Sequence, residues 1–136
     1  MVFKKHKGIR EVRIERAKKV LRFIEIHPEL SRKEIAENLD IKELAMKDVF
    51  GWIVLWAKEK RSVQKIVEKH EETRIERIAK EILRYIEKRP DTSYRELVKK
   101  LNASITIISK SMNLIIVWGE TDPKIKKIWE RYKKKV

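Results

Sequence analysis

Cysteine is absent from the 136 residues, so the chain has neither a disulfide framework nor a thiolate metal site. Only three glycines and three histidines occur. So few glycines leave no room for a glycine-rich loop that cradles a phosphate. The spacing of His6, His27 and His70 suits no metal site, and no nucleophilic side chain has a visible general base. We therefore expect no cofactor, no bound metal and no enzymatic activity.

Long apolar runs are also lacking. The most apolar segment, WIVLWA at 52–57, is far shorter than the roughly 20 residues that a membrane-spanning helix needs. The first residues, MVFKKHKGIREVR, are basic but hold no apolar stretch of the kind that marks a secretory signal. These observations predict a cytoplasmic protein without membrane contact.

Positive charge is present in excess. Lys and Arg number 35 against 21 acidic residues, which gives a net charge of +14. Residues 1–70 hold 18 basic and 11 acidic residues, so each half of the chain carries +7. Such a surface attracts polyanions, nucleic acid above all. The other interpretation is a lysine-rich surface that only keeps the protein soluble. Abundant Lys, Glu, Arg and Ile beside one Gln and three Asn resemble the composition of intracellular proteins from hyperthermophilic archaea.

One segment of the sequence occurs twice. LRFIEIHPELSRKEIAENL at 21–39 returns as LRYIEKRPDTSYRELVKKL at 83–101. When position 21 is aligned with position 83 and no gap is allowed, 15 of the 54 residue pairs between 17–70 and 79–132 are identical. Similarity at a fixed offset is the signature of a repeated structural unit. We therefore expect a tandem repeat of two units, 1–70 and 71–136.

The spacing of apolar residues and the signals for helix ends predict four helices in each unit, so the predicted fold is all-α. The first helix covers about 10–26 and 72–88 and stops ahead of Pro28 or Pro90, because the residue before a proline avoids the helical region. The third covers about 42–58 and 104–118. In the second copy its β-branched residues would also suit strands, and the match with the first copy decides for a helix.

Capping signals mark the starts of the second and fourth helices. Ser31 with Glu34, and Ser93 with Glu96, fit the capping box that opens a helix. The fourth helix begins near Ser62 in the first unit and at Asp122, followed by proline, in the second. Because 62–88 contains no Gly or Pro, one long central helix can join the two units.

This order of elements resembles a helix-turn-helix DNA-binding domain, and HPELSRKEIAENLDI is similar to the opening of many winged-helix regulators. The positions that match the packing residues of that pattern are Ala36, Leu39, Ile41, Met46 and Val49 in the first unit and Val98, Leu101, Ala103 and Ile108 in the second. The turn has Asp40 or Asn102 where the family usually has Gly, and both residue types tolerate the left-handed conformation. Too few residues follow Trp118 to form a wing. We therefore expect a wingless, all-helical variant in two tandem copies.

The resemblance implies which side chains face a nucleic acid. The third helix of each unit would enter the major groove by its N-terminal part, with the preceding helix over the backbone. In the second unit this surface offers Ser104, Thr106, Ser109, Lys110 and Asn113. Asn can read adenine, and Ser or Thr can contact bases or phosphates. The first unit offers Lys42 and Lys47 beside Glu43 and Asp48, and these two carboxylates would face phosphates. We therefore expect the second unit to make the better contacts with the bases.

Other residues are expected at the phosphate backbone. Arg32, Lys33, Tyr94 and Arg95 lie at the starts of the second helices, where free N–H groups also attract anions. The basic N-terminal arm and the C-terminal KIKKIWERYKKK add charge. Trp56 and Trp118 fall in the most apolar part of the third helices, which favours a place in the core over base stacking.

Three functions remain open. The first is a protein that binds double-stranded DNA, such as a transcriptional regulator or a plasmid or viral accessory factor. The second is a non-catalytic helical subunit of a ribonucleoprotein or replication assembly, which would follow RNA or single strands. The third is a protein–protein interaction module. For that function, or for a homodimer, the apolar third helix offers Phe50, Trp52, Ile53, Leu55 and Trp56 on almost all its sides.

Overall fold

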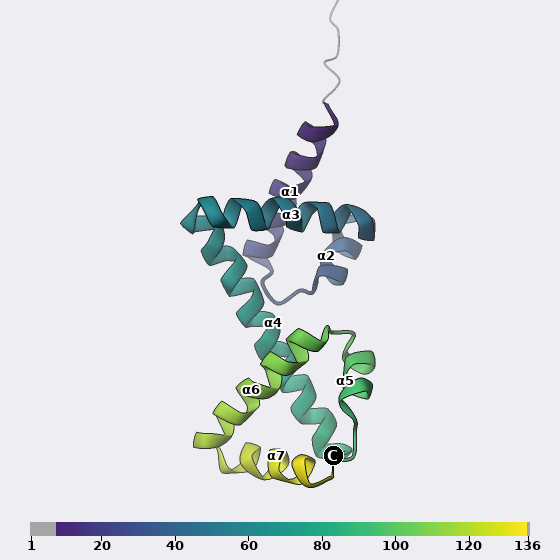
Figure 1. Ribbon diagram of the computed structural model, residues 1–136, viewed down its shortest axis with the longest axis vertical. Coiled ribbons are helices and arrows are strands. Elements are labelled where there is room, and N and C mark those ends of the chain that lie inside the picture. The colour runs from purple at the N-terminus through teal and green to yellow at the C-terminus, as the bar shows by residue number, and fades with distance from the viewer. Residues whose placement is uncertain (1–7, 136) are drawn as a thin grey trace, which may run out of the picture. The chain divides into compact units, whose positions relative to one another are not determined.

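The computed structural model describes residues 8–135, and every regular element in that range is an α-helix (Figure 1). In chain order the helices are α1 (Ile9–Ile26), α2 (Arg32–Leu39), α3 (Glu43–Glu59), α4 (Arg61–Lys88), α5 (Tyr94–Leu101), α6 (Ile105–Thr121) and α7 (Pro123–Lys135). The prediction of an all-α fold is confirmed, and the β-branched segment that follows Ser104 lies in a helix, with Ser104 as the N-cap residue. By its internal contacts the chain divides into two compact units, unit 1 (Met1–Glu72) and unit 2 (Thr73–Val136).

The helix bounds follow the spacing seen in the sequence. The helices α2 and α5 have 8 residues each, and α3 and α6 have 17 residues each. In both pairs the two helices begin at equivalent positions of the repeated sequence. The helix α4 is continuous for 28 residues, as the lack of Gly and Pro between 62 and 88 predicted. The third helices end later than expected, at Glu59 and Thr121, since the polar residues after each tryptophan continue the helix.

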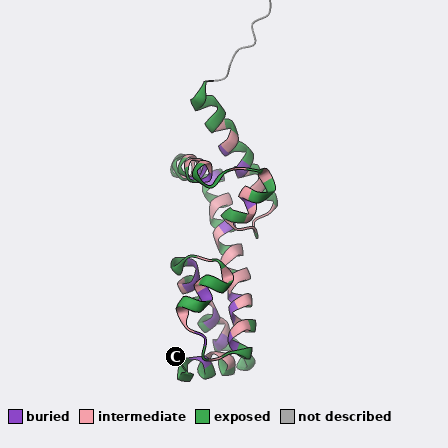
Figure 2. Cartoon of the chain, turned by 90° about the vertical axis from the view of Figure 1, so that its right-hand side faces the viewer, coloured by how far each residue is buried: buried purple, intermediate pink, exposed green. Residues whose placement is uncertain are grey.

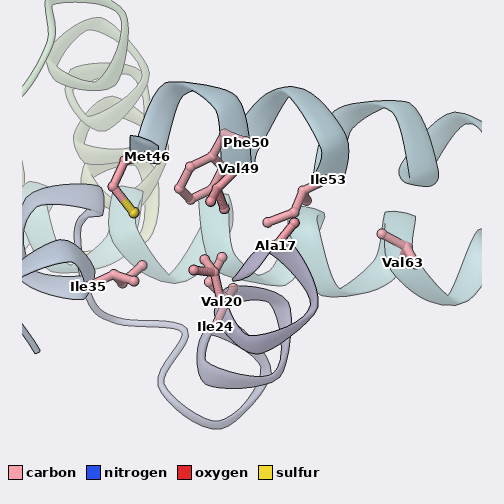
Figure 3. Close-up of a cluster of buried hydrophobic side chains, with 9 residues drawn as sticks. All are labelled: Ala17, Val20, Ile24, Ile35, Met46, Val49, Phe50, Ile53 and Val63. Carbon is pink, nitrogen blue, oxygen red and sulfur yellow. The ribbon is translucent and has the colours of Figure 1, made fainter. Parts of the chain in front are cut away.

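The core of unit 1 is built where α1, α2 and α3 pack together beside the start of α4. Its buried residues are Ala17, Val20 and Ile24 from α1, Ile35 from α2, Met46, Val49, Phe50 and Ile53 from α3, and Val63 from α4 (Figure 3). On α1 and α3 these residues recur at steps of three and four, which places them on one face of each helix. Burying one such aliphatic side chain contributes about 1.5–3 kcal/mol.

The core of unit 2 is built by the second half of α4 together with α5, α6 and α7. Its buried residues are Ala79, Ile82 and Ile86 from α4, Leu97 from α5, Ile108, Met112 and Ile115 from α6, and Tyr132 from α7. Buried and exposed residues alternate along the helices, so each helix buries one side (Figure 2). Within this core Ser111 is fully buried, and its Oγ donates a hydrogen bond to the Ile75 carbonyl at 3.2 Å. This hydrogen bond satisfies the buried hydroxyl of Ser111, which stands where the first unit has the apolar Val49.

Side chains close the helix ends as the sequence predicted. At α2 the Ser31 Oγ accepts the Glu34 N–H, and Glu34 Oε1 accepts the Ser31 N–H, both at 3.1 Å. At α5 the structure gives the first half of this box, in which the Ser93 Oγ accepts the N–H of Glu96 at 3.2 Å. At α7 the Asp122 carboxylate accepts the N–H of Lys124 at 3.0 Å. Each such cap stabilises its helix by about 1 kcal/mol.

In 8–135 no single helix is long and apolar enough to cross a membrane, although α5 and α6, bent by 109°, meet the criteria of length and composition as a pair.

Candidate nucleic-acid interface

The connection between α5 and α6 is a tight turn of three residues. Asn102 has φ 49° and ψ 45°, and the N–H of Ala103 donates back to the Val98 carbonyl at 3.3 Å. Asp40 takes the same left-handed conformation after α2, with φ 52° and ψ 51°. Asn and Asp visit this region more readily than other residues that have a Cβ, so the turn is formed without glycine, as predicted. The turn leaves α5 and α6 bent by 109°.

The open face of α6 holds most of the residues predicted to read bases. Thr106, Lys110 and Asn113 are exposed, and their steps of four and three place them on one side of the helix. Ser104 is the N-cap residue, and its Oγ accepts the N–H of Ile107 at 3.2 Å. This bond leaves the hydroxyl proton of Ser104 available to an outside acceptor. The N-terminal half of α6 therefore presents two hydroxyls, one ammonium and one amide.

Two residues that we predicted as separate phosphate or base contacts bind each other instead. The hydroxyl of Tyr94, in the first turn of α5, lies 2.6 Å from Ser109 Oγ on α6, and both side chains are half-buried. This bond ties α5 to α6 close to the exposed stripe. Each hydroxyl keeps further hydrogen-bonding capacity beyond this bond. Tyr94 and Ser109 therefore hold α5 and α6 together and can still contact a ligand at this surface. The neighbouring Arg95 is exposed.

A buried tyrosine lies near this pair. Tyr132 of α7 is 4% exposed, and its hydroxyl has no hydrogen-bond partner among the described residues. Burial raises the pKa of Tyr132, and the nearby Tyr94 raises it further. Tyr132 is therefore neutral at physiological pH.

The equivalent position of the first copy is His70, and its surroundings differ. His70 is 5% exposed, its Nε2–H donates to the Leu30 carbonyl at 2.7 Å, and its ring stacks on Phe50 with centroids 6.4 Å apart. No sequence signal predicts this bond, because the acceptor is a backbone carbonyl far away along the chain. His70 is thus part of the core of unit 1.

The corresponding surface of unit 1 is less acidic than its sequence suggests. Lys42 and Lys47 are exposed, as expected of phosphate contacts. Asp48 is half-buried, and its Oδ2 lies 3.9 Å from Nε of Arg13 on α1. This ion pair offsets the charge of Asp48, so Glu43 in the first turn of α3 is the carboxylate that remains on the exposed face.

The first turn of α2 contains Arg32 and Lys33, both exposed. The guanidinium carbon of Arg32 lies 4.0 Å from the centre of the Phe50 ring, a cation–π contact. Arg32 as a whole is exposed, but its guanidinium is partly buried against this ring, which lowers the pKa of Arg32; the side chain stays charged at physiological pH. The contact orients one of the predicted phosphate ligands on the edge of the unit 1 core.

Some basic residues were not predicted, and others lie outside the described range. Lys99 and Lys100 are exposed in the last turn of α5, directly before the turn. Lysines at that place also favour the negative end of the helix dipole, so the sequence offered no separate signal for them. Lys4 and Lys7 of the N-terminal arm lie outside the described residues. The basic C-terminal segment forms α7, whose apolar residues Ile125, Ile128 and Trp129 pack against the core.

The two repeated tryptophans, Trp56 and Trp118, are half-buried and pack against the cores of their units. In the part of the chain that the structure describes, no three His, Asp or Glu side chains are grouped so as to hold a metal ion. No protein-family model matches the chain, and no curated protein or solved structure was found to be similar to it.

Proposed function

We propose that this chain binds double-stranded DNA through two tandem, wingless helix-turn-helix units, and that unit 2 makes most of the contacts with base edges. Each unit consists of a first helix, a short capped helix, a tight turn and a longer helix that presents its N-terminal half to the major groove. Such a protein would act as a transcriptional regulator or as an accessory factor of a plasmid or virus.

The observation that supports this most is the pair α5 and α6. The two helices of a helix-turn-helix meet at about 90–120° across a turn of three or four residues. Here the bend is 109° and three residues lie between the helices. Beyond that turn Thr106, Lys110 and Asn113 stand on one exposed side. These are side chains that can read base edges and contact phosphates.

The charge distribution agrees with this geometry. The +14 net charge is shared equally by the two halves of the chain, which suits a protein in which both units approach the DNA backbone. In unit 1 the exposed cations include Lys33, Lys42 and Lys47. We assign unit 1 mainly to phosphate contacts, because the start of its third helix presents Lys42, Glu43 and Lys47, whereas the start of α6 presents hydroxyls, one lysine and an amide.

The test is the double variant Lys110→Ala and Asn113→Ala. The loss of a base contact typically costs about 1–3 kcal/mol, so duplex DNA should bind roughly 5- to 150-fold more weakly. Removing one phosphate contact should also reduce the slope of log affinity against log salt by about one. Both quantities come from fluorescence anisotropy with a labelled duplex at several salt concentrations.

The matched control is Gln64→Ala with Lys65→Ala. It also removes one amide and one cation, but from exposed positions on α4. We expect the control to bind with less than threefold loss, by the weak effect of one distant charge. Equal losses in the two double variants, with circular dichroism unchanged, would mean that net charge and not the α6 surface determines binding.

A further inference from the structure

Unit 1 has an open apolar groove that the nucleic-acid interface does not use. It has a volume of about 530 Å³ and lies between α1, α3 and the start of α4. Its apolar lining includes Leu21, Trp52, Trp56 and Val63. Leu55 also lines it and is 46% exposed. Apolar and aromatic surface of this kind is typical of a site that binds a partner.

The rim of this groove is basic. Arg10, Lys18 and Lys60 line it together with one carboxylate, that of Glu59. The Arg10 guanidinium carbon lies 5.8 Å from the centre of a Trp52 ring. An occupant that matches this rim is apolar in the middle and acidic at its edge.

The chain itself contains such a surface in unit 2, at the equivalent positions of the second copy. There Glu76 and Asp122 stand where unit 1 has Ile14 and Lys60, and both are exposed. Glu72, which matches Arg10 and is also exposed, is the last residue of unit 1 and lies one turn before Glu76 on α4. The apolar residues are retained, since Trp118 matches Trp56 and Val117, which matches Leu55, is 56% exposed. The repeat thus keeps the apolar character and reverses the net charge around it, although Lys80 retains the positive charge of Lys18.

We propose that the basic groove of unit 1 in one copy receives the acidic face of unit 2 in a second copy, and that the chain assembles head to tail. Apolar side chains would meet apolar side chains, and cations would meet carboxylates, which sets both the partner and the register. A contact between two different faces leaves one groove and one acidic face open at the ends, so further copies can add. The proposal does not depend on nucleic-acid binding and is tested without it.

The test uses two full-length charge-reversal variants. The groove variant is Lys18→Glu with Lys60→Glu, and the face variant is Glu72→Lys with Glu76→Lys. Sedimentation equilibrium at about 0.15 M salt measures the average mass, because a Debye length of about 8 Å at that salt screens repulsion between distant charges. We expect the wild-type mass to rise above 16.4 kDa with concentration, and each variant alone to stay at the mass of one chain.

The decisive sample is the equimolar mixture of the two variants. The face variant keeps an intact groove and the groove variant keeps an intact acidic face, and the reversed groove and the reversed face are again opposite in charge, so the mixture should associate where each variant alone does not. If net charge alone controlled association, the groove variant should self-associate more than the wild type, because it is less positive and its copies repel each other less. The proposal predicts that it self-associates less. Control variants with the same charge changes at exposed positions elsewhere, Lys19→Glu with Lys58→Glu and Glu87→Lys with Glu120→Lys, should associate like the wild type.

Three results would overturn the proposal. A wild-type chain that stays at the mass of one chain at every concentration would show that the two faces do not join copies. A mixture in which both variants stay single would show that the groove and the acidic face are not partners. Control variants that dissociate as fully as the test variants would assign the effect to overall charge. Circular dichroism of each variant separates these results from misfolding.

Discussion

Replacing Tyr132 by Phe should stabilise the protein, while the same replacement at His70, the equivalent position of the first copy, should destabilise it. Both side chains are buried aromatic rings in the cores of their units. The Tyr132 hydroxyl has no hydrogen-bond partner among the described residues. The His70 Nε2–H donates to the Leu30 carbonyl at 2.7 Å. The sign of the effect therefore depends on whether the buried polar atom is satisfied.

The magnitudes follow from the cost of a buried polar group. An unpaired donor or acceptor costs about 1–3 kcal/mol, and Phe keeps the Tyr132 ring, so Tyr132→Phe should raise the free energy of unfolding by about 1 kcal/mol. His70→Phe removes one hydrogen bond and strains the packing against Phe50, so it should lower that free energy by about 1–2 kcal/mol. In thermal unfolding a change of about 1 kcal/mol shifts Tm by a few degrees for a chain of this length.

Urea unfolding of the full chain, followed by far-ultraviolet circular dichroism, measures both variants against the wild type. An unchanged m-value would show that the midpoint shift reports stability. The reasoning would be refuted if Tyr132→Phe lowered the free energy of unfolding by about 1 kcal/mol or more, as one lost hydrogen bond would. It would also fail if both replacements changed stability in the same direction by the same amount.

Three further predictions concern single sites. Gly51→Ala should raise the free energy of unfolding by about 0.5–1 kcal/mol in urea titration, because a Cβ at this exposed position in α3 meets no atom within 4 Å outside the adjoining backbone of its own helix; an unchanged or lower value would contradict this. Asn102→Ala should lower the free energy of unfolding by about 1–2 kcal/mol, since Asn102 has φ 49°. Asn102→Gly should be close to neutral, and equal effects of the two replacements would argue against the left-handed turn. The pKa of Tyr132 is raised on folding, so above about pH 10, the unfolded value, the unfolded chain loses the Tyr132 proton that the folded chain keeps. The free energy of unfolding of the wild type therefore falls as the pH rises from there through the folded value. The free energies of the wild type and Tyr132→Phe, measured across the alkaline range, should therefore diverge further above about pH 10, and a constant difference would refute the assignment.

Local sequence signals predicted the helices well. Ser31, Asp122 and the prolines mark ends that depend only on neighbouring residues, and the structure has the caps at those places. Asp40 and Asn102 were correctly expected in the left-handed region, because the chain has to turn there and their side chains tolerate it. The match with the first copy also decided the ambiguous segment at 104–118, whose β-branched residues would also have suited strands.

Contacts between distant residues were not predictable in the same way. The bond between Tyr94 and Ser109 joins two side chains that each looked like a separate ligand for nucleic acid. The pairing of Asp48 with Arg13 depends on how α3 crosses α1. A periodic pattern shows which face of a helix is buried, but it does not show which neighbour a half-buried polar side chain meets. The candidate interface was thus predicted as a surface, and its internal bonds were found only in the structure.

The central claim is tested most directly by fluorescence anisotropy of the wild type with random duplex DNA and with single-stranded RNA across a series of salt concentrations. We predict micromolar or tighter binding of the duplex, in preference to the single strand, with log affinity falling linearly with log salt concentration. The slope then gives the number of phosphates neutralised. No binding of the duplex even at the lowest salt concentration would contradict the account and would leave the +14 charge without a nucleic-acid role.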